Sequence, residues 1–209
     1  MLSHLNEQFE ALRKRLEDEH HQASLILIAS AKPDDGADLT AHGLAEALAA
    51  SGHATALVDV RSHAAPQRAV DESRPDVREA AQILPHRRGA ALAMIAYSGT
   101  DDPATAVPAF AATLRERYRY AVIDGAAIPQ NEVAAILSSL ADAVVLTVRN
   151  GRMSSREDEV LLSVLDRGRR PVLGVVTVDR KAIAAFTKHE LHFTPSTEVV
   201  PLMRAVANV

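Results

Sequence analysis

The residues best placed to do chemistry form one short turn, AKPDDGADLT, which runs from Ala31 to Thr40. It follows the apolar run SLILIAS and precedes an alanine- and leucine-rich helical pattern. A strand, a turn and a helix in this order are the layout of a phosphate-binding loop, in which backbone amides surround the phosphates, a lysine spans the outer two and a hydroxyl binds magnesium. Aligned on Gly36, however, the lysine position is Ala37 and the hydroxyl position is Asp38. The turn therefore has the predicted shape of a phosphate loop without its usual chemistry.

The electrostatics of this turn argue against bound phosphates. The lysine is missing, and Asp34 and Asp38 bring carboxylates to the turn. Two unit charges about 4 Å apart at an effective dielectric near 20 interact by roughly 4 kcal/mol. Nothing in the turn would clamp the outer phosphates during transfer. We therefore expect no catalytic residues and no bound cofactor by the usual mechanism.

Two further acids stand where predicted strands end. Asp59 ends ALVD and Asp124 ends YAVID. Each alone could simply cap a turn. In open α/β sheets, however, ligands bind beyond the carboxyl ends of the strands. Together with the turn, these acids predict one edge of the sheet as the candidate site.

The elements that must position these residues alternate along the chain. Apolar runs rich in Val and Ile predict strands at Ser24–Ser30, Thr55–Val60, Ala91–Ala96, Tyr120–Asp124, Ala143–Val148 and Val172–Val178. Helical patterns lie at Asp38–Ser51, Ala104–Arg117, Asn131–Ala141, Met153–Arg167 and Glu198–Ala207. This alternation predicts an α/β, doubly wound, mostly parallel sheet with helices on both faces.

The ends of the chain and one central region complete the layout. Residues 1–209 are predicted to be a single domain, with an N-terminal amphipathic helix within 1–23, from Leu2 to about Gln22, and an α/β core in 24–209. The polar region Ser62–Gly89 is predicted to hold one short helix around Asp76–Leu84. The SGTDD segment, Ser98–Asp102, is predicted to be a turn.

Composition excludes several classes of protein. A formal charge of -4 gives no electrostatic basis for binding nucleic acid. The absence of Cys excludes disulfides and thiolate metal sites. No apolar run reaches the roughly 18 residues of a membrane span, and no signal peptide is visible. The spacing of His189 and His192 does not match a metalloprotease motif, so no metal site is predicted. We expect a cytoplasmic protein that does not insert into the membrane directly.

The order of these segments resembles a known family, the bacterial tyrosine kinases (BY-kinases) of capsule and exopolysaccharide synthesis. These are deviant-Walker P-loop ATPases related to the Min and Par proteins. SLILIASAKPDDGADLT resembles the strand and S-x-x-P-G-E-G-K-[ST]-T loop of that family, and ATALVDVRS resembles its L-[LI]-[IV]-D-x-D-x-R strand. YRYAVIDGAA, ADAVVLTVRNGRMS and RRPVLGVVTVD resemble its later strands, and EQFEALRKRL its first helix. The resemblance covers about residues 5 to 180 and implies a P-loop NTPase fold.

The departures from the family pattern fall on its catalytic positions. Lys32, Pro33, Asp34, Asp35, Gly36, Ala37 and Asp38 form the remnant of the nucleotide loop. In the second motif, Asp59 matches the family's first acid, whereas Arg61 replaces the second. In the third motif, Asp124 matches the family's acid, whereas Ala126 and Ala127 replace its two prolines. The C-terminal tyrosine cluster of the family is missing, since the only tyrosines are Tyr97, Tyr118 and Tyr120. The resemblance thus implies a degenerate kinase.

The first helix carries the family's oligomerisation pattern E-x-x-R-x-x-R in altered form. The matching positions are Glu7, Glu10 and Arg13, so the middle charge is reversed. Like charges can forbid the self-association that the pattern promotes. The alternatives left open are a hetero-interface, a different dimer, and an ordinary amphipathic helix packed on its own domain.

Three functional hypotheses follow from these observations. The favoured one is a non-catalytic regulatory or scaffolding component of exopolysaccharide or capsule biosynthesis. The resemblance implies polysaccharide-assembly partners for it, such as the cytoplasmic tail of a membrane chain-length regulator that recruits the protein to the membrane. The second is an ATPase or kinase that uses ATP and Mg²⁺, with Asp38, Asp59 and Asp124 around the metal and Lys32 or Arg61 as the phosphate cation. The third is a Min- or Par-like positioning protein, which the one Arg and the Pro of TEVVPLMRAVANV disfavour.

Overall fold

The protein folds around one seven-stranded sheet. The computed structural model describes residues 2–19, 24–60, 80–85, 91–97, 102–151, 155–168 and 171–190. The strands are β1 (Leu25–Ser30), β2 (Thr55–Asp59), β3 (Ala80–Pro85), β4 (Ala91–Ala96), β5 (Tyr120–Ala127), β6 (Ala143–Arg149) and β7 (Val172–Val178). Their spatial order is β3-β4-β2-β5-β1-β6-β7. Neighbouring strands are parallel except β3, which pairs antiparallel with β4 at one edge.

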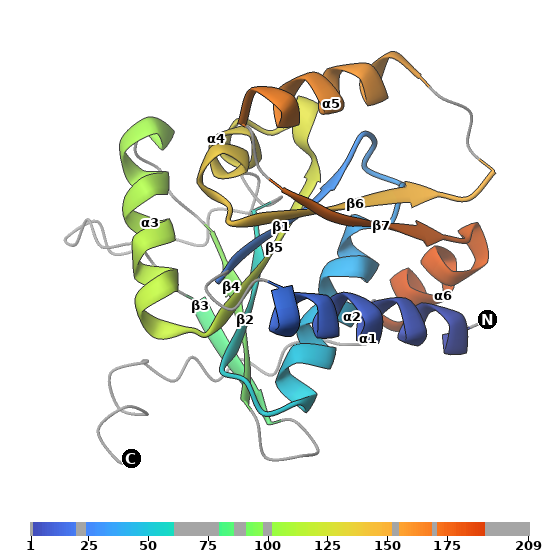
Figure 1. The fold of residues 1–209 in the computed structure, drawn as a ribbon, viewed down its shortest axis with the longest axis horizontal. Coiled ribbons are helices and arrows are strands. Elements are labelled where there is room, and N and C mark those ends of the chain that lie inside the picture. The colour runs from blue at the N-terminus through green and yellow to red at the C-terminus, as the bar shows by residue number, and fades with distance from the viewer. Residues whose placement is uncertain are drawn as a thin grey trace.

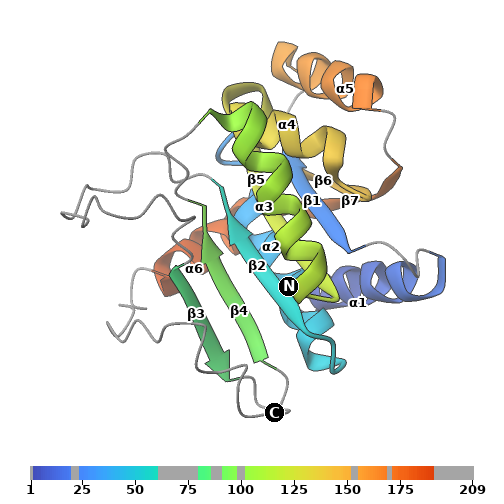
Figure 2. The ribbon, with the colours of Figure 1, turned by 90° about the vertical axis from the view of Figure 1, so that its left-hand side faces the viewer.

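Helices cover both faces of this sheet (Figure 1, Figure 2). They are α1 (Leu2–Glu19), α2 (Ala37–Ala50), α3 (Pro103–Arg117), α4 (Glu132–Leu140), α5 (Arg156–Gly168) and α6 (Arg180–Glu190), with a 3-10 turn, η1 (Ile128–Gln130), before α4. One layer contains α1, α2 and α6, and the other contains α3, α4 and α5. The predicted doubly wound, mostly parallel α/β fold is confirmed. No described helix is long and apolar enough to cross a membrane.

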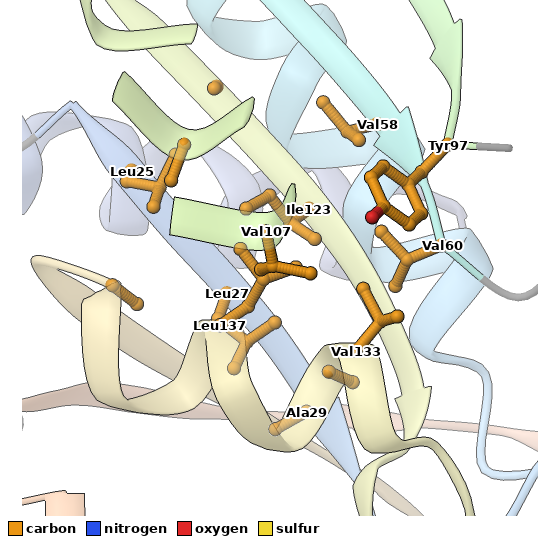
Figure 3. Packing of buried hydrophobic residues seen from close by; sticks show 14 of the residues in the cluster. Leu25, Leu27, Ala29, Val58, Val60, Tyr97, Val107, Ile123, Val133 and Leu137 are labelled. Carbon is orange, nitrogen blue, oxygen red and sulfur yellow. The ribbon is translucent and has the colours of Figure 1, made fainter. Parts of the chain in front are cut away.

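Each face of the sheet has its own apolar core, because side chains alternate between the two faces along a strand. Ile26 and Ile28 of β1 pack in the cluster under α1 and α2. Leu25 and Leu27 pack in the opposite cluster, with Val107 of α3 and other residues from α3 and α4, as Figure 3 shows. Burial on both faces explains why the central strands are continuous apolar runs.

The first helix packs on its own domain. Its apolar stripe is buried and contains Leu5, Phe9, Leu12 and Leu16. The stripe rests on α2, where a Cβ at Gly43 would lie 2.0 Å from Phe9 Cε2, so the ring of Phe9 occupies the space that a side chain at position 43 would need. This packing is the third of the alternatives that the sequence leaves open for α1.

The polar side of α1 closes the free edge of β7. Gln8 donates its side-chain amide to the carbonyl of Thr177 at 3.5 Å and accepts from the N–H of Thr177 at 3.2 Å. Two turns further along, Arg15 Nη1 donates to the carbonyl of Leu173 at 2.5 Å. Side chains of the helix thereby replace the missing neighbour strand at two places along this edge.

Several expected elements differ in the structure. The prediction of a helix at Asp76–Leu84 is wrong for its described residues, 80–84. They belong to β3, Ala80–Pro85, which pairs with the whole length of β4. Strand pairing here overrides the helical preference of two alanines. The sequence also did not predict α6 at Arg180–Glu190. Finally, β5 runs past Asp124 to Ala127, since the alanines that replace the family's prolines still have the N–H groups that strand pairing needs.

Other predictions agree with the structure or fall outside it. The remaining strands and helices lie within a few residues of their predicted bounds. The first helix ends at Glu19, and α5 begins at Arg156. The predicted helix at Glu198–Ala207 lies outside the described residues, as do Arg61, His192 and most of the turn at Ser98–Asp102.

Candidate functional site

The turn after β1 has the strand-turn-helix shape that the sequence predicts. Ser30 ends β1, and α2 begins directly after Gly36, which adopts the left-handed conformation with φ 84°. That conformation favours glycine. A Cβ at Gly36 would also lie 3.0 Å from Ile183 of α6, so α6 packs directly against the turn. The backbone of a phosphate loop is therefore retained in outline.

Carboxylates of the chain itself accept hydrogen bonds from the backbone amides of this turn. Asp38 Oδ1 accepts from the N–H of Leu39 in the first turn of α2 at 2.8 Å. Asp35, which is fully buried, accepts at Oδ2 from the N–H of Lys32 at 3.3 Å. The amino end of a helix attracts anions through its free amides and its dipole. Here a protein carboxylate occupies one of the amides that a phosphate would use.

Among the described residues, Lys32 of the turn and Arg149 beside it form ion pairs with carboxylates. Arg149, the last residue of β6, donates to Asp34 Oδ2 at 2.6 Å. Lys32 Nζ lies 3.8 Å from Glu157 Oε2 in the first turn of α5. A hydrogen bond from its own backbone N–H, another from Ser155 and the charge of Lys32 lower the pKa of Glu157 below its usual value. The turn is thus connected to both β6 and α5 by opposite charges.

The two strand-end acids lie side by side. Asp59 of β2 and Asp124 of β5 are register partners on neighbouring parallel strands. Leu57 and Val122, two residues earlier on these strands, belong to the core under α2, so both carboxylates point to that same face. Asp124 is buried and Asp59 is half-buried. The sequence correctly places both acids at the same sheet edge as the turn.

The mutual placement of the acids bears on the second hypothesis, in which they would surround a metal ion. Within the part of the chain that the structure describes, no three Asp, Glu or His side chains converge as they would around a metal ion. Asp38, Asp59 and Asp124 do not form such a group among the described residues. His189 lies in α6, far along the chain from these acids.

Sequence reasoning missed two residues of the site, Arg149 and Glu157. A signal for Arg149 was available, because it follows a predicted strand and the carboxyl ends of parallel strands share one edge. Glu157 lies in the first turn of a predicted helix, where acids are common for reasons unrelated to a site. Of the predicted loop residues, Pro33 is exposed and Ala37 is buried at the start of α2.

The predicted partner residues on α1 interact within their own helix. Arg13 donates to Glu10 at 2.9 Å and to Glu17 at 2.5 Å. Glu17 in turn accepts from His53 at 2.9 Å when that imidazole nitrogen is protonated. The bond to Glu17 is the main cause that raises the pKa of Arg13. Glu7 is exposed on the same helix.

Comparison with known proteins places the fold. No family model matches the sequence, and no curated protein matches it. Among solved structures, the chain has the fold of bacterial tyrosine kinase domains, which have a P-loop core. The chimerical protein CapA2B2 superposes with a TM-score of 0.62 at 22% identity, covering 83% of this chain and 84% of that one.

Two kinase domains give the same result. The kinase domain of the Escherichia coli tyrosine kinase ETK has a TM-score of 0.59 at 14% identity, covering 83% of this chain and 77% of that chain. The kinase domain of VpsO has a TM-score of 0.60 at 17% identity, covering 83% and 95%. The BY-kinase-like P-loop fold expected from the sequence motifs is therefore confirmed.

Proposed function

We propose that this protein is a non-catalytic relative of the exopolysaccharide tyrosine kinases, which acts by protein contact as a regulatory or scaffolding component of capsule or exopolysaccharide synthesis. The fold supports the relationship. One observation supports the loss of catalysis: Lys32 of the turn and Arg149 beside it, in the part of the chain that the structure describes, pair with carboxylates of the chain. A phosphate would have to break these pairs and also approach Asp34 and Asp38.

The resemblance supports the choice of partners. Kinases of this family act together with the cytoplasmic tail of a membrane chain-length regulator, and we propose a partner of this kind here. In this proposal the chain keeps the fold but has lost the catalytic residues of the loop, and its surface serves to bind another protein. Nucleotide, in this proposal, is not required.

Isothermal titration of the purified chain with ATP and ADP, with and without Mg²⁺, tests the loss of nucleotide binding. We expect no binding at nucleotide concentrations of about 1 mM, because Ala37 and Asp38 replace the lysine and the hydroxyl that hold phosphates and because the carboxylates of Asp34 and Asp38 repel them. Micromolar, Mg²⁺-dependent binding would overturn the proposal and favour the enzyme hypothesis.

A restored loop provides the positive counterpart. The triple substitution Asp34→Gly, Ala37→Lys and Asp38→Ser should gain nucleotide affinity, because it removes two carboxylates and returns the lysine and the hydroxyl. The matched control makes the same change in net charge on exposed positions elsewhere, with Asp18→Asn, Ala112→Lys and Glu116→Gln. Equal affinity of the two variants would show that bulk charge, not the loop, explains any binding.

A genetic test addresses the role in polysaccharide synthesis. Deletion of the gene should change the amount or chain length of the polysaccharide. Asp59→Asn should complement the deletion fully, since the proposal gives this carboxylate no chemical role. Loss of complementation by a folded Asp59→Asn protein would contradict a non-catalytic function.

A further inference from the structure

The large apolar side chains that are exposed belong to α5 and β7, two elements that follow one another in the chain. Among the described residues they are Val160 and Leu162 of α5, exposed by 40% and 56%, and Val172 and Val175 of β7, exposed by 44% and 54%. Single exposed apolar residues are ordinary, whereas a group on adjacent elements indicates a binding surface. The arrangement of these four side chains defines which of them form one surface.

The two valines of β7 lie on the face of the sheet that α5 covers. Val172 is the register partner of Val144 and Val175 of Leu146, and register partners in a parallel sheet point to the same side. Val144 and Leu146 of β6 pack in one cluster with Leu161 and Leu165 of α5. Both valines therefore lie on the α5 side of the sheet, where their side chains are exposed.

Leu162 lies beside these two exposed valines. Leu161 and Leu165 form the buried stripe of α5, with Leu162 on one flank and Val164 on the other. Val164 packs against the cluster that also contains residues of α4. The chain then passes from β6 through α5 to β7, and such crossovers are right-handed, which places the Leu162 flank toward β7. We call Leu162, Val172 and Val175 the α5–β7 shelf.

Acidic side chains border the shelf. Glu159 precedes Leu162 by three residues and Asp166 follows it by four, so both lie on the same flank of α5, and both are exposed. The remaining side of the shelf is the outer edge of β7, where Gln8 and Arg15 already bond to the backbone. A partner therefore cannot simply add a strand at these positions and must bind through side chains.

We propose that the α5–β7 shelf binds a basic amphipathic segment of a partner polypeptide, with apolar side chains on the valines and Lys or Arg beside Glu159 and Asp166. The proposal rests on the proposed function, for which it provides the protein-binding surface. A second copy of this chain fits poorly, because a twofold contact would bring the acids of both copies together. An anionic lipid surface is repelled by the same acids.

Two synthetic peptides of the same apolar pattern test this charge preference. One alternates Leu with Lys and the other Leu with Glu, both in helical spacing, and each is titrated against the full chain by fluorescence anisotropy. The Leu/Lys peptide should bind at least about tenfold more tightly, since attraction replaces repulsion at two carboxylates. Equal affinities would overturn the proposal.

Substitutions with a matched control locate the site. Leu162→Ser should weaken Leu/Lys binding by about tenfold, because burial of an exposed Leu side chain is lost. Val160→Ser, on the other flank of the same helix, should leave it unchanged. An equal loss in both variants, or a loss in neither, would contradict the assignment. Neither peptide assay contains nucleotide. Failure of the peptide to bind would therefore contradict the shelf alone, whereas nucleotide binding in the titration would contradict the proposed function.

Cysteine protection gives a second readout. The chain contains no Cys, so Val175→Cys and Val160→Cys each carry one exposed thiol. The Leu/Lys peptide should slow maleimide alkylation at position 175 about fivefold or more when about nine-tenths of the chain is occupied, and should leave position 160 unaffected. If saturating peptide left the alkylation rate at position 175 unchanged, the peptide would bind elsewhere and the proposal would be overturned.

Discussion

Asp142 lies outside the loop and binds three residues through its two carboxylate oxygens. Its Oδ2 accepts from the backbone N–H groups of Ser24 and Leu25 at 3.0 and 2.8 Å, and its Oδ1 pairs with Arg115 at 2.8 Å. It therefore connects the start of β1 to α3 and β6. Burial alone would raise the pKa of Asp142, but the hydrogen bonds from Arg115 and the two amides lower it below its usual value.

Asp142→Ala should lower the free energy of unfolding at pH 7 by about 2–4 kcal/mol, because the buried N–H of Leu25 loses its acceptor and Arg115 loses its partner. Urea denaturation measures this free energy, with the exposed Glu116→Ala as the control that should change it by less than about 0.5 kcal/mol.

Since the pKa of Asp142 is lowered on folding, its charge stabilises the protein above the unfolded pKa near 3.9, and this contribution is lost as the pH falls further. The difference between Asp142→Asn and wild type should therefore shrink from pH 7 to pH 3. A constant difference would show that the charge of Asp142 is not involved.

At the candidate site, the sequence predicts the individual side chains better than their pairing. The absence of lysine at Ala37 and the acids at Asp34 and Asp38 are visible in the sequence. The partners Arg149 and Glu157 lie more than a hundred residues further along the chain, and only the fold brings them to the turn. Contacts of this range depend on strand order, which residue types alone do not determine.

At the scale of the elements, α1 is attached to the domain through its contact with α2. Phe9 fills the space that Gly43 leaves on α2, while the ion pairs of Arg13 stay on the surface of α1. Exposed ion pairs within a helix stabilise it only by tenths of a kcal/mol. Apolar packing therefore accounts for most of the attachment of α1.

Gly43→Ala should destabilise the protein by about 1–3 kcal/mol, although alanine is the better helix former, because the added methyl overlaps the ring of Phe9. In a Phe9→Ala background the same substitution should become neutral or stabilising by up to about 1 kcal/mol. Thermal or urea unfolding of the four proteins completes the cycle. An additive result would mean that the two side chains do not meet.

The strands that the sequence predicts correctly are continuous apolar runs, such as β1 and β6. The segment AAQILP lacks such a pattern, and its identity as β3 comes from pairing with β4. Among the described side chains of α6, Ala182 is buried in the core and Ile183 and Phe186 pack against it, so the apolar stripe of this helix is short. Both elements depend on tertiary contacts more than on local preference.

At the scale of the whole molecule, the chain itself covers two described surfaces that would otherwise favour self-association. The β7 edge is bonded at two positions by Gln8 and Arg15, and the apolar stripe of α1 is buried in its own domain. The α5–β7 shelf is bordered by acids. An edge strand that is already covered does not template pairing with another chain.

We therefore expect the purified protein to sediment as a monomer of 22.4 kDa at concentrations of tens of micromolar. Glu10→Arg restores the family's charge at the middle of E-x-x-R-x-x-R but should not produce a ring, because Arg13 keeps its bond to Glu17 and Leu5, Phe9 and Leu12 stay buried. Sedimentation velocity of both proteins measures this. Association of Glu10→Arg alone would mean that the sign of one side chain is the whole barrier to assembly. Association of the wild type as well would show that an interface exists outside α1 and that the acids beside the shelf do not prevent it.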